Sequence, residues 1–142
     1  MSMRPKFIKN IEQVEEELHY LDEPPKEYRT RRRLGKATGA ERLGVNYCRL
    51  RPGQVSSRFH YHTREEEFFL ILIGRAVLHV GKDTYELEKS DCVSILPGGP
   101  AHQLRNKFKE ECIYLVFSNR NPEDSILYPE NGFIPRSYKT SQ

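Results

Sequence analysis

The feature of this 142-residue chain that most constrains its fold is a series of short apolar or alternating segments from residue 28 onward. Gly, Pro and Asn turn signals separate these segments. Parallel βαβ units need a helix between consecutive strands, and the intervals here are too short to hold one. Many short strands at regular spacing are typical of a β-sandwich or barrel. The expected strands are residues 28–34, 43–50, 57–62, 67–73, 76–80, 84–87, 92–95, 102–106 and 112–118.

The two ends of the chain carry different patterns. Asn10 and Gln13 have the spacing of a capping box, and the apolar residues that follow recur at helical spacing until Pro24 ends the pattern. The C-terminal segment reads as irregular but is too apolar for a free tail, so we expect it to pack on the barrel or on a partner. The predicted organisation is an N-terminal helical arm (1–27), a β-barrel (28–120) and a C-terminal tail (121–142).

Length and composition exclude several classes of protein. The length predicts one domain, and the net charge of +3 is too small to suggest a nucleic-acid-binding domain. The longest uninterrupted apolar stretch, residues 68–73, is far shorter than the about 20 residues that cross a bilayer. The N-terminus lacks the apolar segment of a secretory signal, and the three cysteines lack metal or disulfide spacing. We therefore expect a cytoplasmic protein that binds neither nucleic acid nor membrane.

A cluster of arginines, Arg29, Arg31, Arg32 and Arg33, lies in the first expected strand. Two interpretations are open. The guanidinium groups could contact phosphate or an anionic substrate. Alternatively, the positive charge could protect an edge strand from pairing with another sheet, which is the commoner role of such a cluster.

Three of the five histidines form a pattern that suits a metal ion. His60 and His62 are two residues apart in an expected strand, so both imidazoles point to the same face. Glu66 and Glu67 follow after a short turn, and a carboxylate here faces the histidine pair if the two strands are antiparallel. His102 follows a Pro-Gly-Gly-Pro turn. Three imidazoles and one carboxylate suit zinc, iron, nickel, copper or manganese rather than calcium.

Each part of this pattern has a simpler interpretation when taken alone. A His-x-His pair in a strand is more often structural or exposed, and a run of three glutamates is usually solvated. Their combination on apolar strands is more informative, because a buried charge is costly unless it is paired or bound to a metal.

In this region the chain resembles the cupin superfamily. The first motif of that family consists of a glycine, a His-x-His pair, a glutamate and a second glycine. The chain holds one more residue than the family pattern between the first glycine and the first histidine. The matching residues here are Gly53, His60, His62, Glu67 and Gly74.

The second motif of the family has a glycine, then Pro-x-Gly, then a histidine and an asparagine. In this chain the place of the leading glycine is occupied by Asp91, or by Ser90 with one inserted residue. Both departures lie in turns, so they affect loop geometry more than the ligands. The remaining positions of this motif are Pro97, Gly99, His102 and Asn106.

The resemblance implies an all-β double-stranded β-helix of the jelly-roll type, to which the pattern after Asn10 adds a short N-terminal helix. Glu66 fits the shorter of two spacings in the first motif, but Glu67 is preferred because six residues separate it from Gly74. In the family, the matching positions bind a divalent transition metal, which here would be Zn, Fe, Ni or Mn. These positions are His60, His62, Glu67 and His102.

The resemblance also implies a function. Cupins include metal-dependent oxygenases, decarboxylases and isomerases, so we expect an enzyme that acts on a small polar or carboxylated metabolite. No separate general base or nucleophile stands out, and a non-catalytic small-molecule sensor is the alternative. Arg58 shares a face with His60 and is a candidate for binding a substrate carboxylate. Because both faces of residues 68–73 are apolar, the outward face needs a cover, and we expect a homodimer.

Overall fold

The computed structural model describes residues 3–18, 28–129 and 132–135. Within them the chain forms one 3-10 turn, η1 (Ile11–Gln13), one short helix, α1 (Leu34–Thr38), and twelve strands. The strands are β1 (Glu16–Leu18), β2 (Thr30–Arg33), β3 (Leu43–Leu50), β4 (Tyr61–His62), β5 (Glu67–Ile73), β6 (Ala76–Val80), β7 (Asp83–Leu87), β8 (Cys92–Ile95), β9 (His102–Arg105), β10 (Cys112–Asn119), β11 (Ser125–Tyr128) and β12 (Gly132–Pro135).

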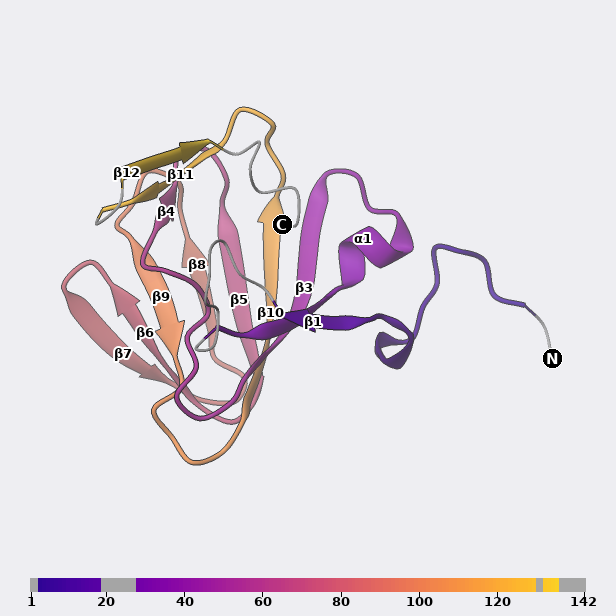
Figure 1. Ribbon diagram of the computed structural model, residues 1–142, viewed down its shortest axis with the longest axis horizontal. Coiled ribbons are helices and arrows are strands. Elements are labelled where there is room, and N and C mark those ends of the chain that lie inside the picture. The colour runs from indigo at the N-terminus through magenta and orange to yellow at the C-terminus, as the bar shows by residue number, and fades with distance from the viewer. Residues whose placement is uncertain (1–2, 19–27, 130–131, 136–142) are drawn as a thin grey trace.

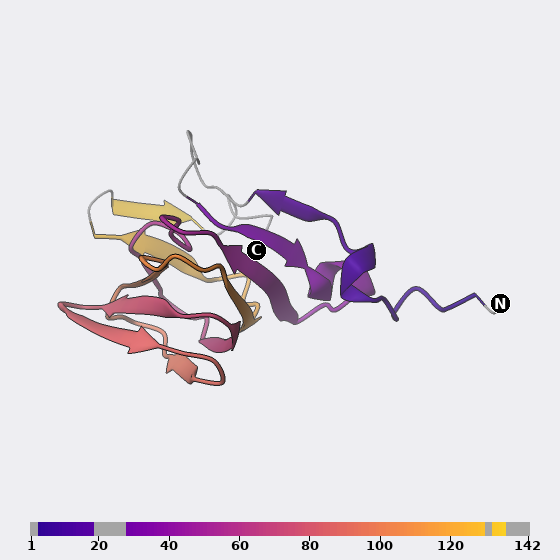
Figure 2. The same ribbon diagram turned by 90° about the horizontal axis from the view of Figure 1, so that it is seen from below.

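The strands form one large and two small sheets. The large sheet has the order β1-β2-β3-β10-β5-β8, and the small sheets have the orders β7-β6-β9 and β12-β11-β4. Figures 1 and 2 show β6, β7 and β9 on the opposite side of the interior from β3 and β10. All pairings between these strands are antiparallel. The arrangement confirms the predicted all-β jelly-roll barrel.

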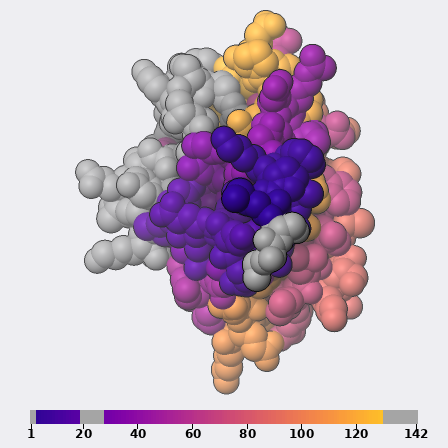
Figure 3. Space-filling model, turned by 90° about the vertical axis from the view of Figure 1, so that its right-hand side faces the viewer, coloured from indigo at the N-terminus to yellow at the C-terminus, as the bar shows by residue number. Residues whose placement is uncertain are grey.

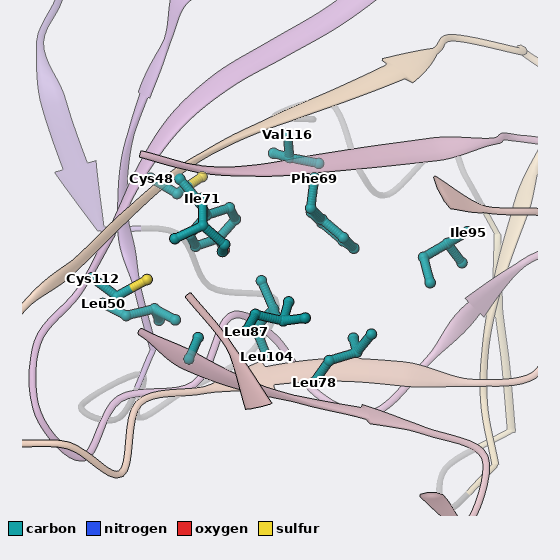
Figure 4. Packing of buried hydrophobic residues seen from close by; sticks show 12 residues of the cluster. Cys48, Leu50, Phe69, Ile71, Leu78, Leu87, Ile95, Leu104, Cys112 and Val116 are labelled. Carbon is teal, nitrogen blue, oxygen red and sulfur yellow. The ribbon is translucent and has the colours of Figure 1, made fainter. Parts of the chain in front are cut away.

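The interior is filled by side chains that alternate along the strands. Along β3 every second residue is buried, and Phe69 and Ile71 point inward from β5. Each fully buried apolar side chain of this size contributes about 1.5–3 kcal/mol. The core cluster, most of which is labelled in Figure 4, consists of Cys48, Leu50, Phe69, Ile71, Ala76, Leu78, Leu87, Ile95, Leu104, Cys112, Tyr114 and Val116.

The N-terminal segment differs from the expected helix. The capping box of Asn10 and Gln13 is present, but the turn ends at once, because Val14 is extended. The chain then continues as β1, which pairs with β2. A short isolated helix is marginal in water, whereas pairing with β2 supplies backbone hydrogen bonds. The helix prediction is confirmed for one turn and wrong for residues 14–18, while residues 19–21 lie outside the described residues. Figure 3 shows this segment, in indigo, lying across the segment that contains β2, α1 and β3.

The pairing with β1 also changes the interpretation of the arginine cluster. Strand β2 lies between β1 and β3, so it is an inner strand of the sheet. The prediction that its arginines protect a sheet edge is therefore wrong. Arg29 and Arg31 are buried, whereas Arg32 and Arg33 are only partly so.

The C-terminal segment is more regular than expected. Its first part forms β11, which pairs with β4 and with β12. Four residues are too few for an alternating pattern to be recognised in the sequence, and the strand exists because β4 offers a pairing edge. Ile126 and Tyr128 are buried, so this first part of the segment packs on the barrel.

The outer face of the large sheet keeps an apolar patch. Phe68 is 37% exposed, and its ring lies 6.0 Å from that of Phe117. The homodimer expected from this face stays a prediction, which light scattering would test. Within the described residues no helix has the length and apolar character needed to span a membrane.

Candidate metal centre

The three motif histidines and Glu67 meet inside the barrel although they come from separate strands. His60 and His102 face each other, and each donates its backbone N–H to the carbonyl of the other. His62 follows on the same face of the chain, and Glu67 begins β5. All four side chains are buried. The alternation of a strand therefore places the His-x-His pair as the sequence indicated.

The nitrogen atoms surround one oxygen of Glu67. Glu67 Oε1 lies 2.8 Å from His102 Nε2, 3.4 Å from His62 Nε2 and 3.9 Å from His60 Nε2. Glu66 is exposed, and its backbone N–H donates to Asn119 Oδ1. Of the two rival carboxylates, Glu67 is thus the one that the structure brings to the histidines.

The opposite ring nitrogens of His60 and His62 are held by other groups. His60 Nδ1 lies 2.8 Å from the carbonyl oxygen of Arg58, and His62 Nδ1 lies 2.8 Å from Asp124 Oδ2. Both acceptors require a proton on Nδ1, which leaves Nε2 of each ring as the nitrogen that faces Glu67 and that can bind a metal once it carries no proton. Partners of this kind orient the histidines of metal sites and make them better ligands.

The charges in this cluster are strongly coupled. Burial, together with the electrostatic effect of the neighbouring His102, lowers the pKa of His60 to about 3. Burial opposes the charge on His62 as well, but Glu67 and Asp124 outweigh it and raise the pKa of His62 to about 10. Although burial works against ionisation of Glu67, its histidine neighbours hold the pKa of this carboxyl well below the usual value.

This donor set fits a divalent transition metal. The ligand atoms of His60, His62 and Glu67 all lie within 4.8 Å of one another. Bonds of about 2.1 Å to one ion would place its ligand atoms about 3–4 Å apart, so small side-chain adjustments suffice. His62 Nε2 is buried without a hydrogen-bond partner, an arrangement that a metal bond would satisfy. Three imidazoles with one carboxylate also leave room on an octahedral ion for a substrate.

Sequence reasoning missed two carboxylates beside this cluster. Asp124 accepts hydrogen bonds from the backbone of Arg64 and Glu65 through Oδ1 while Oδ2 accepts from His62. Glu65 is 1% exposed, and its Oε2 accepts the backbone N–H of Asn121. The one sequence signal was that Glu65 alternates with Glu67. Nothing in the sequence connects Asp124 to a histidine 62 positions away.

The structure also shows where two further residues named in the sequence analysis lie, Arg58 and Asn106. The guanidinium of Arg58 lies 4.5 Å from the centre of the Tyr128 ring, and the residue lines an open groove of about 350 Å³. Its role in binding a carboxylate stays a prediction. Asn106 joins loops, since its side-chain amide donates to the carbonyls of Leu50 and Glu110.

Gly74 ends the first motif for a steric reason. It adopts a positive φ of 77°, which disfavours other residues, and a Cβ added there would collide with the carbonyl oxygen of Glu111. The glycine therefore allows β5 and β10 to approach closely beyond the site.

Comparison with known proteins agrees with this geometry. The model of the cupin domain family matches residues 46–118. The chain belongs to the cupin family. A search of curated proteins finds no match. The comparison with individual proteins therefore rests on solved structures.

Two cupin structures resemble this one over most of its length. A putative sugar phosphate isomerase from Acidithiobacillus ferrooxidans is 28% identical, with a TM-score of 0.78, over 88% of this chain and 82% of its own. A sugar phosphate isomerase of the cupin superfamily from Silicibacter pomeroyi is also 28% identical, with a TM-score of 0.77, over 88% of both chains. The polyketide cyclase RemF from Streptomyces resistomycificus, at 24% identity and a TM-score of 0.66 over 84% of this chain and 80% of its own, shares the fold.

Proposed function

We propose that this cupin is a metal-dependent enzyme of the isomerase type, acting on a small metabolite with neighbouring hydroxyl and carbonyl groups. The observation that carries the proposal is the convergence of three buried imidazoles on Glu67 Oε1, with two rings anchored through Nδ1. The proposed ligands are His60, His62, Glu67 and His102. The names of the two similar structures at 28% identity favour isomerisation over oxygenation and decarboxylation.

A bound divalent ion would act as a Lewis acid that polarises a substrate carbonyl and acidifies a neighbouring hydroxyl. The chain's own residues shape the surroundings of that position. The ring of Phe69 lies 5.8 Å from that of His102, and the ring of Tyr128 lies 5.9 Å from that of His60. Two aromatic side chains therefore border the histidine cluster.

Two nearby carboxylates have positioning roles in this proposal. Asp124 and Glu65 are buried and accept backbone N–H groups, and Asp124 also holds His62. Since these contacts keep both carboxylates in place, we assign them to the support of the ligands rather than to proton transfer.

Metal analysis followed by a substrate panel tests the proposal. We expect about one divalent transition-metal ion per chain by mass spectrometry of the purified protein. We also expect turnover of at least one aldose or ketose phosphate, with deuterium uptake at the carbon beside the carbonyl measured by NMR in D₂O. Both signals should be lost in Glu67→Gln and kept in Glu66→Gln, which removes an exposed carboxylate one position away.

The alternative function, a non-catalytic sensor, predicts a different result. Saturable binding of a panel compound by metal-loaded protein without any turnover would support the sensor and contradict the enzyme. A protein that binds no metal would contradict both the ligand set and the proposed chemistry.

A further inference from the structure

Two arginines inside the barrel have no role in the metal centre. Arg29 is 7% exposed and Arg31 is 2% exposed. Arg31 pairs in register with Cys48, which in turn pairs with Tyr114. Side chains of directly paired residues lie on the same face of a sheet, so Arg31 shares the interior face with two members of the core cluster. Figure 4 shows Cys48 beside Ile71 at the edge of that cluster.

The hydrogen bonds of this arginine pair are incomplete. Arg29 Nη1 donates to Tyr114 Oη at 2.8 Å. Among the described residues, Arg29 Nε and both Nε and Nη1 of Arg31 are buried without a hydrogen-bond partner. The carboxylate beside Arg31 is that of Glu17, whose Oε1 lies 3.8 Å from Arg31 Nε and also forms an ion pair with Arg33. Arg29 and Arg31 therefore have N–H groups that are available to donate to a ligand.

The charges of this pair are also poorly compensated. Burial and the neighbouring charge of Arg29 lower the pKa of Arg31 to about 9, so Arg31 still carries its charge at pH 7. Burial raises the pKa of the Cys48 thiol and of the Tyr114 hydroxyl, so both are neutral at that pH. A buried cation is costly without an anionic partner, and a guanidinium binds oxyanions through two parallel hydrogen bonds.

One core side chain connects the arginine pair with the histidine cluster. Burial works against the charge of Arg29, but its polar neighbours, Glu67 among them, outweigh it and raise the pKa of Arg29. The ring of Phe69 lies 6.0 Å from that of Tyr114 and 5.8 Å from that of His102, so one side chain links the partner of Arg29 to a proposed ligand. The hydrogen-bond partner of Arg29 and a proposed metal ligand therefore border the same ring.

We propose that Arg29 and Arg31 form the subsite that binds a phosphoryl group of the substrate while its reacting atoms lie at the histidine cluster. Two adjacent cations favour a doubly charged phosphoryl group over a carboxylate. This proposal rests on the proposed function, which identifies the part of the substrate that reacts at the histidine cluster. It also explains why a strand places two cations inside an apolar core.

Inorganic phosphate is the probe for the experiment. The melting temperature of the full-length protein is measured against phosphate concentration at constant ionic strength, both metal-loaded and after EDTA treatment. A ligand that binds only the folded state raises this temperature in a saturable way. We expect such a rise in both forms, larger than the rise with acetate. No saturable rise, or a larger one with acetate, would overturn the phosphoryl assignment.

Three variants separate binding from a structural role. Arg29→Met and Arg31→Met should bind phosphate at least about tenfold more weakly. Arg32→Gln, which removes a charge that points to the backbone of Ile11 and Val14, should respond like the wild type. An unchanged phosphate response in both methionine variants would show that the arginines are structural and would overturn the proposal.

A lysine variant covers the case in which a methionine variant fails to fold. Arg31→Lys keeps the charge but loses the planar fork, so its phosphate affinity should fall by about tenfold while its fold is kept. Affinity equal to that of the wild type would contradict a bidentate contact.

Metal content distinguishes failure of the subsite from failure of the proposed function. If the wild type binds metal but shows no phosphate response, the subsite is wrong and the metal-dependent function stands. If it binds phosphate through these arginines but no metal, the proposed function fails and the anion site stands.

Discussion

The interior of this barrel has two regions that are held together in different ways. In the apolar region, Ile71 and Leu104 pack within a cluster of aliphatic side chains. In the polar region, His62 and Glu67 are also buried. Strand β5 contributes to both, since Glu67 and Ile71 share one face of it. Burial alone stabilises the apolar region, whereas each polar group needs a specific partner. The fold therefore separates the residues that stabilise the barrel from those proposed to bind the metal.

Ile71→Ala should have the largest effect on stability and leave metal binding intact. Truncation of a fully buried isoleucine costs about 2–5 kcal/mol, because it removes apolar contacts and leaves a cavity. Urea unfolding of the metal-free protein measures this loss, and metal analysis provides the second readout. Loss of metal by a folded variant would show that the two regions are not separate.

Glu67→Gln should act mainly on metal binding. Removal of the anionic ligand should weaken metal binding at least about 100-fold, more than the loss of an outer partner does. The free energy of unfolding of the metal-free protein should fall as well, because the imidazolium of His62 loses one of its two anionic partners. Competition with a chelator measures the affinity, and Glu66→Gln is the matched control. Equal metal affinity in the two glutamine variants would refute the assignment of Glu67.

Asp124→Asn should have an intermediate effect. The asparagine oxygen can still accept the backbone N–H groups of Arg64 and Glu65, but its amide nitrogen cannot accept a proton from His62 Nδ1. We expect metal affinity to fall by about 10–100-fold while the fold persists. An unchanged affinity would mean that the histidine needs no orienting partner.

The pH dependence of metal binding is the smallest effect when it is expressed per pH unit. In the metal-free protein the pKa of His62, raised to about 10, keeps this imidazole protonated at pH 7. A metal must displace that proton, so affinity should rise about tenfold per pH unit between pH 7 and 9. His60, whose pKa is lowered to about 3, has no proton to release there. Chelator competition at pH 7, 8 and 9 measures the slope, and a flat profile would contradict it.

The same raised pKa affects stability. Its contribution to the metal-free fold is complete below 6.5, the ordinary pKa of histidine, and is lost as the pH rises through about 10. The free energy of unfolding of the metal-free protein should therefore decline over this interval. The polar region thus responds to pH, whereas the apolar region should not.

Much of this structure could be predicted from the sequence because the informative patterns are local. The expected bounds of β3, β5, β6 and β8 agree with the structure, since alternation and turn residues act over a few positions. The convergence of His60, His62, Glu67 and His102 followed from strand alternation and from the family resemblance; that they bind a metal stays a prediction.

The rest depends on contacts that the local pattern does not encode. The helical spacing after Asn10 did not reveal that β2 would pair with this segment. The role of Asp124 depends on the return of a distant tail to β4. For Arg29 and Arg31, the sequence showed two cations but not that the strand turns both into the core.

Because the C-terminal segment returns to β4, the proposed site extends beyond the residues that match the family model. Residues 46–118 are the part shared with the family model, yet Asp124, Arg29 and Arg31 all lie outside them. Grafting that shared stretch onto a foreign scaffold would carry over the four proposed donors without the group that orients His62 and without the two interior cations. An engineer who wishes to transplant this centre should therefore move both flanks with it.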